Sequence, residues 1–428
     1  MRIGIIIGRI GGVDGVALET EKWIDVLKRI GHSVFIISGQ FQERMMDVET
    51  ETIVPEMSFH SPESFWSQKK AFFAPEIDPQ ELIEHINLYS KLIYKKLKNW
   101  AKEKKIDLII SENASALPSH LEMGIAIKNA VAKLEIPTIT HDHDFAWERD
   151  DRYISPHQEI NNFIEEIFPL RLPNSVHAVI NSNAQKTLKE KFNRNSVVVP
   201  NVMNFDIPFG VKTDKNKCLH NYLGYNCKKD ILLFQITRIV SRKAIEVAIE
   251  LIHKLEDKKV KLVITGSAAD DEGNNYYNKL INQIHDLKLG KQVSFASHLF
   301  HNKGLSGDHG EVQFSLSDAY AQATACTYFS TYEGFGNAFV EAVLAKRPIF
   351  VNDYKPVYWP DIGSKGFEAV MLKDNDLNDI KLAEMKEVIY NPDKAREVAE
   401  HNFELGKKHF SYDTLEEKLV QLIEMATS

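Results

Sequence analysis

The feature that most constrains the fold is a series of short apolar strands separated by amphipathic helices, and it runs through the sequence twice. The first series begins with "RIGIIIG" (residues 2–8) and the second with "ILLFQIT" (231–237). Strands that are apolar on both faces are typical of parallel sheets covered by helices on each side. Each series is sufficient for one doubly wound α/β domain. Two such domains in one chain suggest a ligand held between them.

The two series also set the expected domain boundaries. We expect a Rossmann-like acceptor-binding domain over residues 1–205 and a Rossmann-like nucleotide-sugar-binding domain over residues 206–405. An amphipathic helix within residues 406–428 is expected to pack back on the first domain. Further strands are expected at residues 32–38, 106–111, 136–141, 177–182, 196–201, 260–266, 292–297, 325–331 and 347–353.

Composition excludes several classes of protein. A formal net charge of -8 gives no global attraction to nucleic acid, and no apolar stretch approaches the ~20 residues of a membrane span. The three cysteines lack metal-finger spacing and do not pair evenly, which suits a reducing compartment. The N-terminal apolar run is too short for a secretory signal. The sequence therefore predicts a cytoplasmic protein.

The segment "STYEGFGNAFVEAVLAK" (330–346) joins the end of an expected strand to the start of a helix. Gly334 and Gly336 allow the backbone to approach a ligand closely, and Asn337 is expected to cap the helix. The first N–H groups of a helix and its positive dipole end together favour an anion. This turn is therefore predicted to hold a phosphate group.

Two acids flank the same turn. Glu333 approaches from the strand, and Glu341, about one turn into the helix, leans toward the helix N-terminus. A carboxylate accepts two hydrogen bonds from a vicinal diol, so a diphosphate at the amides leaves the acids for neighbouring sugars. A simpler interpretation makes Glu341 a helix-dipole partner and Glu333 a solvated turn residue. The pairing of both acids with the glycine turn favours the ligand interpretation.

A basic pair follows another expected strand end. Arg238 and Lys243 flank a helix start in "QITRIVSRKAIEVAIELIHKL" (235–255). Two fixed cations there would neutralise a diphosphate that gains charge as it leaves. The simpler alternative is a solvated basic turn, and Arg242 is a rival for either role because spacing alone does not choose.

These motifs resemble those of the retaining nucleotide-sugar glycosyltransferases of the GT-B fold, family four. "EGFGNAFVE" (333–341) resembles the family's E-x7-E signature, and Arg238 and Lys243 match its Arg-x4-Lys pair. Residues 9–38 resemble its N-terminal glycine loop, helix and strand, and "VVVPNVMNFD" (197–206) resembles the turn before its second domain. The resemblance implies two Rossmann-like domains facing across a cleft.

The resemblance also implies a role for each matched residue. Arg238 and Lys243 would hold the donor diphosphate. Glu341 would bind the nucleotide ribose, and Glu333 the hydroxyls of the donor sugar. Gly12 would approach the diphosphate from the first domain. The full donor site would comprise Gly12, Arg238, Lys243, Glu333, Gly334, Phe335, Gly336, Asn337, Ala338 and Glu341.

The activity that the resemblance implies is transfer of a hexosyl group, with retention, from a nucleotide diphosphate sugar to a hydroxyl of a small-molecule, saccharide or lipid-linked acceptor. The leaving phosphate would help to deprotonate the acceptor. No metal and no cofactor are expected, since cationic side chains and amides do that work. Asn337-Ala338 and Lys346-Arg347-Pro348 depart from the residues usual at those places, which leaves the donor open.

A histidine pair in "ITHDHDFAWERDDRY" (139–153) follows a strand of the first domain. The resemblance places a histidine after such a strand, near the sugar C6 hydroxyl and the reaction centre. His143 is favoured because a helix-like run follows it, and His141 is then assigned to the acceptor side. The two histidines with two aspartates would also suit zinc, but so short a cluster is weak support without a further ligand, and no metal site is predicted.

The acceptor side is expected to include Trp147, Arg149 and Arg152, an aromatic face and two guanidinium groups, together with Asn113 at another strand end. The simpler alternative is a charged helix with Glu148–Arg152 pairing. The basic segment 91–105 suits either anionic lipid or, as favoured, a helix that covers the sheet and turns its lysines to solvent. The long segment 297–311 is expected to border the nucleotide base.

Other functions were weighed against this one. An NAD-dependent dehydrogenase is disfavoured because the first turn lacks G-x-G-x-x-G and no acid ends the strand at residues 32–38. A nucleotide-sugar epimerase or phosphorylase shares the architecture, and so does a non-catalytic nucleotide-sugar-binding protein. The two acids and the basic pair favour transfer over both.

Overall fold

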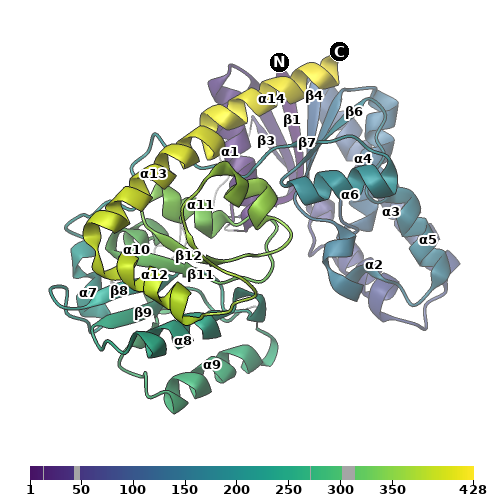
Figure 1. The fold of residues 1–428 in the computed structure, drawn as a ribbon. Helices are drawn as coiled ribbons and strands as arrows, with labels where there is room; N and C mark the ends of the chain where they lie inside the picture. Colours follow the sequence, from purple (N-terminus) through teal and green to yellow (C-terminus); the bar gives the residue numbers. More distant parts are fainter. Residues whose placement is uncertain (13, 43–48, 270, 301–313) are drawn as a thin grey trace. The chain divides into compact units, whose positions relative to one another are not determined.

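The computed structural model describes residues 1–12, 14–42, 49–269, 271–300 and 314–428 of the 428-residue chain. The chain divides into two compact units (Figure 1). Unit 1 comprises Met1–Asn201 and Tyr412–Ser428, and unit 2 comprises Val202–Ser411. Each unit is an α/β domain built around its own parallel sheet.

The described residues of unit 1 form a seven-stranded parallel sheet in the order β3-β2-β1-β4-β5-β6-β7. Its strands are β1 (Arg2–Ile10), β2 (Ser33–Phe41), β3 (Glu51–Ile53), β4 (Leu108–Glu112), β5 (Thr138–Asp142), β6 (Ser175–Val179) and β7 (Val197–Val198). The six predicted strands of the first series are confirmed. β3 was missed because its three residues, which include a glutamate and a threonine, carry no apolar pattern.

The helices of unit 1 pack against this sheet or against one another (Figure 1). They are α1 (Gly15–Arg29), α2 (Pro62–Phe73), α3 (Pro79–Glu103), α4 (Leu121–Leu134), α5 (Gln158–Ile167), α6 (Ser182–Phe192) and α14 (Tyr412–Thr427). Asp14 caps α1, because its Oδ1 accepts a hydrogen bond from the backbone N–H of Ala17 at 3.1 Å.

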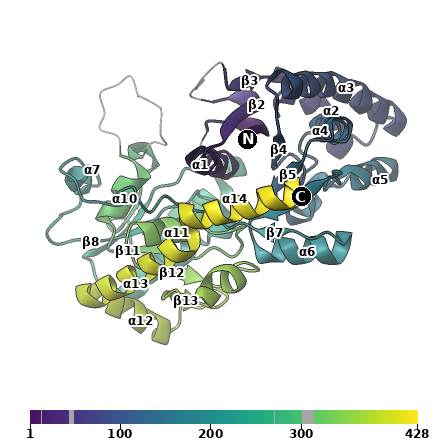
Figure 2. The ribbon, with the colours of Figure 1, turned by 90° about the horizontal axis from the view of Figure 1, so that it is seen from above.

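The C-terminal helix α14 belongs to unit 1, although it follows unit 2 in the sequence (Figure 1 and Figure 2). It packs on α1, β5 and β6. Leu415, Leu419 and Leu422 are completely buried on its inner face, and Glu416 pairs with Arg29 of α1 at 3.1 Å. Burial of this leucine stripe accounts for the packing that the amphipathic sequence pattern predicted.

Helix α3 covers one face of the unit 1 sheet. Ile93, Leu97 and Trp100 are at most 4% exposed, while Lys98 lies above the ring of Tyr94, 5.5 Å from its centroid. The prediction of a covering helix is therefore confirmed for this segment. Among the helices of the described ranges, none combines the length and the apolar character that spanning a bilayer requires.

The described residues of unit 2 form a six-stranded parallel sheet in the order β10-β9-β8-β11-β12-β13. Its strands are β8 (Ile231–Gln235), β9 (Val260–Ile264), β10 (Val293–Phe295), β11 (Ala325–Tyr328), β12 (Ile349–Asn352) and β13 (Val370–Leu372). Its helices are α7 (Leu219–Tyr222), α8 (Ile245–Leu255), α9 (Asn275–Asp286), α10 (Leu316–Gln322), α11 (Asn337–Leu344), α12 (Asp379–Tyr390) and α13 (Pro392–Phe410). The edge strand β13 was not predicted.

The strand orders locate one switch point in each sheet. In unit 1, β1 lies between β2 and β4, and in unit 2, β8 lies between β9 and β11. Successive connections leave these points in opposite directions, so the loops at the carboxyl ends of the strands separate and leave a crevice. The loops after β1 and β4, and those after β8 and β11, are therefore the places where ligands are expected.

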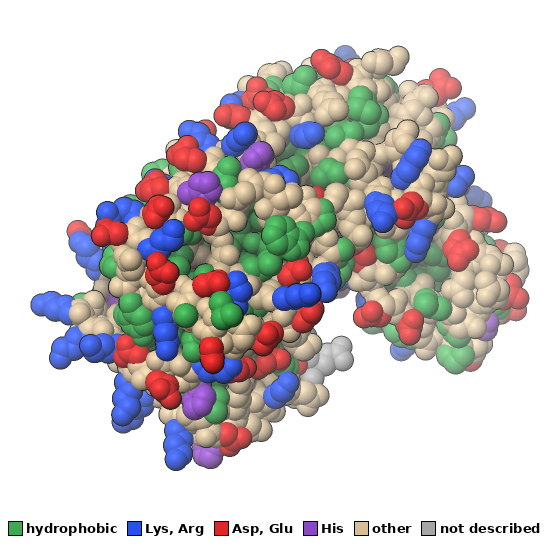
Figure 3. All heavy atoms as spheres, in the orientation of Figure 1, with side chains coloured by type: hydrophobic (Ala, Val, Ile, Leu, Met, Phe, Trp, Pro, Cys, Tyr) green, Lys and Arg blue, Asp and Glu red, His purple; other side chains and the backbone are tan. Residues whose placement is uncertain are grey.

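Charges of both signs are mixed on the face of the molecule that Figure 3 shows. Lysine and arginine side chains alternate there with aspartate and glutamate. The charges on this face are therefore not gathered into a patch of one sign, and the formal net charge of the chain is -8.

Candidate active site

In unit 2 the loops after β8 and β11 bring two cations and one acid together. The Nζ of Lys243 donates a hydrogen bond to Oε1 of Glu333, and the Nη1 of Arg242 lies 2.9 Å from Oε2 of the same carboxylate. Lys243 and Glu333 are each 7% exposed. The Nζ of Lys243 also lies 5.1 Å from the ring centroid of Tyr328. We call Arg242, Lys243 and Glu333 the strand-end cluster.

The electrostatics keep the acid of this cluster ionised. Burial opposes ionisation of Glu333, but the charges of Lys243 and Arg242 outweigh it and hold its pKa below the ordinary value. The strand-end cluster therefore carries a net positive charge. Arg238 is an exposed residue of the loop after β8, so the predicted basic pair extends from a buried lysine to an exposed arginine.

The glycine turn ends in a helix start that only glycine fits. Gly336 is the N-cap of α11 and has φ of 115°, and a Cβ at this residue would lie 2.3 Å from the hydroxyl of the buried Tyr354. The prediction that Asn337 caps the helix was wrong, because Asn337 is already its first residue. Gly336 brings no capping side chain, so no side chain of the cap residue competes for the first backbone N–H groups of the helix.

The remaining predicted donor residues lie around the same turn. Gly334 and Phe335 are in the loop between β11 and α11, and Ala338 is in the first turn of the helix. Oε2 of Glu341 accepts a hydrogen bond from the Tyr320 hydroxyl at 2.9 Å. Burial, followed by the charge of Glu341, raises the pKa of Tyr320 well above its ordinary value, so Tyr320 stays a donor that orients Glu341.

In unit 1 the ends of β4 and β5 carry a second buried group, which we call the histidine cluster: Glu112, His141 and His143. The Nδ1 of His141 lies 2.9 Å from Oε2 of Glu112, and the Nε2 of His143 lies 3.7 Å from the same oxygen. Exposure is 2% for Glu112, 0% for His141 and 8% for His143. Trp23 of α1 stacks on His141 with ring centroids 3.9 Å apart.

Glu112 was not identified from the sequence. Its only signal was a charged residue at the end of an otherwise apolar strand, next to a switch point. Burial opposes its ionisation, but the two histidines lower its pKa to about 2. Burial and the neighbouring His141 also lower the pKa of His143. At neutral pH, Glu112 is therefore ionised and His143 is neutral.

The histidine cluster corrects the ligand set of the zinc alternative. Glu112, His141 and His143 each offer an atom that lies within 4.8 Å of the others, as a metal site requires. The two aspartates of the motif are not part of this set. Asp142 accepts a hydrogen bond from the Thr140 hydroxyl at 2.9 Å, and Asp144 pairs with Arg149.

Asn113 connects the loop after β4 to the histidine segment. Its Oδ1 accepts a hydrogen bond from the backbone N–H of His143 at 3.0 Å, and its Nδ2 donates to Asp144 at 3.0 Å. The backbone of Asn113 is in the left-handed region, with φ of 51°. The side chain therefore supports His143 from within unit 1.

The helix-like run expected after His143 is replaced by two short 3-10 turns, η2 (Ala146–Glu148) and η3 (Asp150–Tyr153). Glu148 folds back to accept a hydrogen bond from the Phe145 backbone N–H at 2.9 Å. Asp150 has φ of 47°, which a continuous helix cannot accommodate. The alternative of a charged helix was therefore wrong.

Two further predicted residues lie on this segment. Trp147 stacks on Phe145 with ring centroids 4.5 Å apart, so its ring is part of a small apolar cluster. The side chain of Arg149 is 50% exposed. Gly12 lies in the loop after β1, where a Cβ would be 2.0 Å from Oε1 of Gln42. Residues 301–311, expected to border the base, lie outside the described residues.

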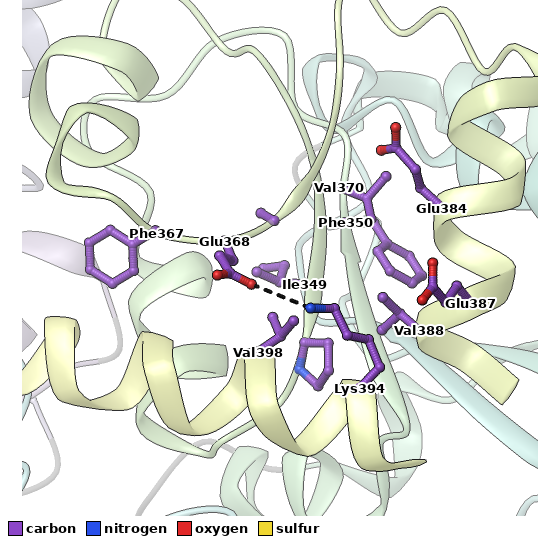
Figure 4. Close-up of a pocket in the computed structure, with 12 residues that line it drawn as sticks. Ile349, Phe350, Phe367, Glu368, Val370, Glu384, Glu387, Val388, Lys394 and Val398 are labelled. Atoms are coloured by element: carbon purple, nitrogen blue, oxygen red, sulfur yellow. Dashed lines mark ion pairs between the residues drawn. The ribbon is translucent and has the colours of Figure 1, made fainter. Parts of the chain in front are cut away.

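A pocket of about 310 Å³ in unit 2 (Figure 4) is lined by none of the predicted site residues. It is lined by the first residues of β12 and β13, Ile349 and Val370, and by residues of α12 and α13. Lys394 points across it toward Glu368 at 4.0 Å. Because the pocket is at the amino ends of the strands, it is not part of the site at their carboxyl ends.

Comparison with known proteins gives the family. The family described as "Glycosyl transferases group 1" matches residues 225–405. Mannosylglucosylglycerate synthase of Petrotoga mobilis is 30% identical over 442 residues, which cover 96% of this chain and 98% of that protein. The enzyme of the same name from Thermotoga maritima is 31% identical, over 98% of this chain and 99% of that protein. The chain belongs to the GT-B glycosyltransferases.

Solved structures share the fold of this glycosyltransferase. A glycosyltransferase from Rickettsia africae aligns with a TM-score of 0.67 at 15% identity, over 100% of this chain and 98% of that chain. Anabaena Alr3699/HepE, solved in complex with UDP-glucose, aligns with a TM-score of 0.65 at 14% identity, over 99% of each chain. The predicted GT-B fold is confirmed, and the relatives give no support to the epimerase alternative.

The buried Asp142 predicts a pH dependence of stability. Burial raises its pKa from 3.8 to about 7, so the folded state keeps a proton that the unfolded chain releases near its ordinary pKa. The contribution of Asp142 to the free energy of unfolding is fully present below pH ~4 and is lost as pH rises toward 7. Asp142→Asn should remove this loss. In urea denaturation, the free energy of unfolding of the variant relative to that of the wild type should therefore rise by about 2 kcal/mol between pH 5 and pH 7.

The exposed Asp151 provides a matched control. Asp151→Asn should follow the wild-type curve at every pH. Parallel stability curves for Asp142→Asn and the wild type would show that Asp142 titrates alike in both states.

Proposed function

We propose that this glycosyltransferase moves a hexosyl group from a nucleotide diphosphate sugar to a hydroxyl of a small acceptor, with retention and without a metal ion. The observation that carries the proposal is the strand-end cluster, in which the loops after β8 and β11 hold two cations against Glu333 beside the start of α11. A net positive cluster beside a helix N-terminus is suited to a diphosphate.

The relatives favour a particular substrate pair. They are named as mannosylglucosylglycerate synthases, which suggests a mannosyl group as the transferred sugar and a glucose- and glycerate-containing acceptor. Glycerate carries a carboxylate, and the half-exposed guanidinium of Arg149 suits such a group. A small anionic acceptor is therefore preferred here to a lipid-linked one.

The cations have separable tasks in this proposal. Arg242 donates from one nitrogen to the backbone carbonyl of Tyr332 at 2.9 Å and pairs with Glu333 through the same nitrogen. That geometry suits a residue that holds the β11 loop and its acid. We therefore assign the diphosphate to Arg238 and Lys243, and assign to Arg242 the support of Glu333.

Within the retaining mechanism that the motifs imply, the pairing of Glu333 argues against a covalent intermediate. A carboxylate neutralised by two cations is a weak nucleophile, so Glu333 is suited to binding the donor sugar rather than to forming a covalent intermediate. The leaving phosphate is then the base nearest the acceptor hydroxyl. Lys243, Arg238 and the α11 amides would stabilise the charge that a metal ion stabilises elsewhere.

In unit 1 we assign His143 to the reaction centre and Trp147 and Arg149 to the acceptor. His141 is completely buried, and the side-chain amide of Asn113 is engaged by His143 and Asp144. Both are therefore better suited to supporting His143 than to contacting the acceptor. A reducing compartment, the cytoplasm, remains the proposed location, since Cys218, Cys227 and Cys326 are free thiols.

The donor assignment predicts selective stabilisation by nucleotides. At a hundredfold excess over its dissociation constant, a bound nucleoside diphosphate should raise the Tm by about 3–10 °C, whereas NAD should not. Differential scanning fluorimetry with UDP, GDP, ADP and NAD measures this. Lys243→Met should abolish the shift and lower kcat/KM at least about 100-fold, because it removes a cation beside the leaving phosphate.

Lys279→Met is the matched control. Lys279 is a 67% exposed lysine of α9 that pairs with Glu246 at 3.9 Å, so its loss should change neither the nucleotide shift nor the rate. A wild-type protein that responds to NAD alone, or a Lys243→Met variant with unchanged nucleotide response, would contradict the donor assignment.

Retention and metal independence can be followed in one proton NMR time course. The first product formed should carry the donor's anomeric configuration, and EDTA should leave its rate within about twofold, because no divalent ion is needed to bind the diphosphate. An inverted product would overturn the retaining assignment. A rate that EDTA abolishes and a divalent cation restores would overturn metal independence.

A further inference from the structure

We propose that Glu112 is a positioning residue that fixes the tautomer of both histidines in the histidine cluster, and that transfer depends on it through His143. The inference rests on the proposed function, because it assigns to His143 a place at the reaction centre. It adds a residue of β4 to a site that the motifs assign to β5 alone.

The position of Glu112 is set by the sheet. Glu112 and His141 are register partners across β4 and β5, so their side chains leave the same face of the sheet side by side. Trp23 covers His141 from the α1 side, with an angle of 18° between the ring planes. Asn113, the next residue after Glu112, holds the backbone N–H of His143 at 3.0 Å. The cluster is thus held from two strands and one helix.

One carboxylate oxygen faces both imidazoles. Oε2 of Glu112 is 2.9 Å from Nδ1 of His141 and 3.7 Å from Nε2 of His143. An ionised carboxylate only accepts hydrogen bonds, so the Nδ1 of His141 carries the proton of that bond, and the negative charge 3.7 Å away favours a proton on the Nε2 of His143 as well.

The consequence for His143 is chemical. A neutral imidazole has one N–H and one lone pair. If its Nε2 carries the proton that faces Glu112, its Nδ1 must hold the lone pair. His143 then accepts a hydrogen bond from a sugar hydroxyl instead of donating one. Glu112 therefore determines whether His143 acts as acceptor or donor. An acid that orients a histidine in this way acts on the reaction without touching the substrate.

A shared metal ion is the competing explanation for the same three residues. The 2.9 Å separation of Glu112 and His141 is that of a direct hydrogen bond. The His141 and His143 rings are 4.2 Å apart at their centroids, with 51° between their planes, which places them in contact with each other. Both observations favour proton sharing, and metal analysis of the purified protein decides between the two.

The test uses Glu112→Leu in the full chain. A leucine of similar size carries neither a charge nor an acceptor, so the facing nitrogens of both histidines lose the group that favours a proton on them. We expect kcat to fall at least about 100-fold while KM for the donor changes less than about threefold, since the variant alters only the orientation of a catalytic group. The Tm measured with nucleotide should shift as in the wild type.

A second readout does not depend on activity. With ¹⁵N-labelled histidine, the ring nitrogens of His143, assigned from a His143→Gln variant, should report a protonated Nε2 in the wild type. In Glu112→Leu the signals of His141 or His143 should show the opposite tautomer. This measurement tests the inference even if no donor is transferred, whereas a wild type inactive with every donor would contradict the proposed function alone.

Glu122→Leu is the matched control. Glu122 is likewise completely buried in unit 1, with a histidine, His120, at 3.2 Å, but it lies on α4 outside the histidine cluster. It should leave kcat and the His143 tautomer unchanged. The inference is overturned if Glu112→Leu keeps kcat within about threefold, if both tautomers stay as in the wild type, or if the purified protein holds one equivalent of a transition metal that this variant loses.

Discussion

The site in unit 2 depends on one interaction, the burial of the Glu333 carboxylate between Lys243 and Arg242. A buried carboxylate without partners is costly, so the β11 loop that carries Glu333 must stay beside the β8 loop that carries both cations. This pairing fixes the loop that leads into Gly336 and α11. It also leaves one cationic charge in excess beside the helix start, and that excess suits an anionic ligand.

Unit 1 also buries a carboxylate, but beside different partners. Its switch point is next to β4, where Glu112 is buried against His141 and His143 rather than against lysine and arginine. Imidazoles share and move protons at neutral pH, whereas lysine and arginine remain charged. The two units therefore place a buried acid at equivalent ends of their sheets, one suited to binding charge and one to directing a proton.

The sequence predicted the parts of this architecture that local pattern determines. Apolar runs gave most strands, and the spacing of Lys243 and Glu333 from two strand ends placed both at one edge of a parallel sheet. Asn337 was misassigned by one residue, because the cap is decided by the φ of Gly336 and by Tyr354. Glu112 was missed because its partners are 29 and 31 residues away, on a neighbouring strand and the loop that follows it. Only strand register brings them together.

The most direct test of the central claim is a crystal structure of the full chain with a bound nucleoside diphosphate. The account predicts that the β-phosphate lies at the start of α11, within hydrogen-bond distance of the Lys243 ammonium and of the backbone amides that follow Gly336. Phosphates bound away from Lys243 and from the carboxyl ends of β8 and β11 would contradict it.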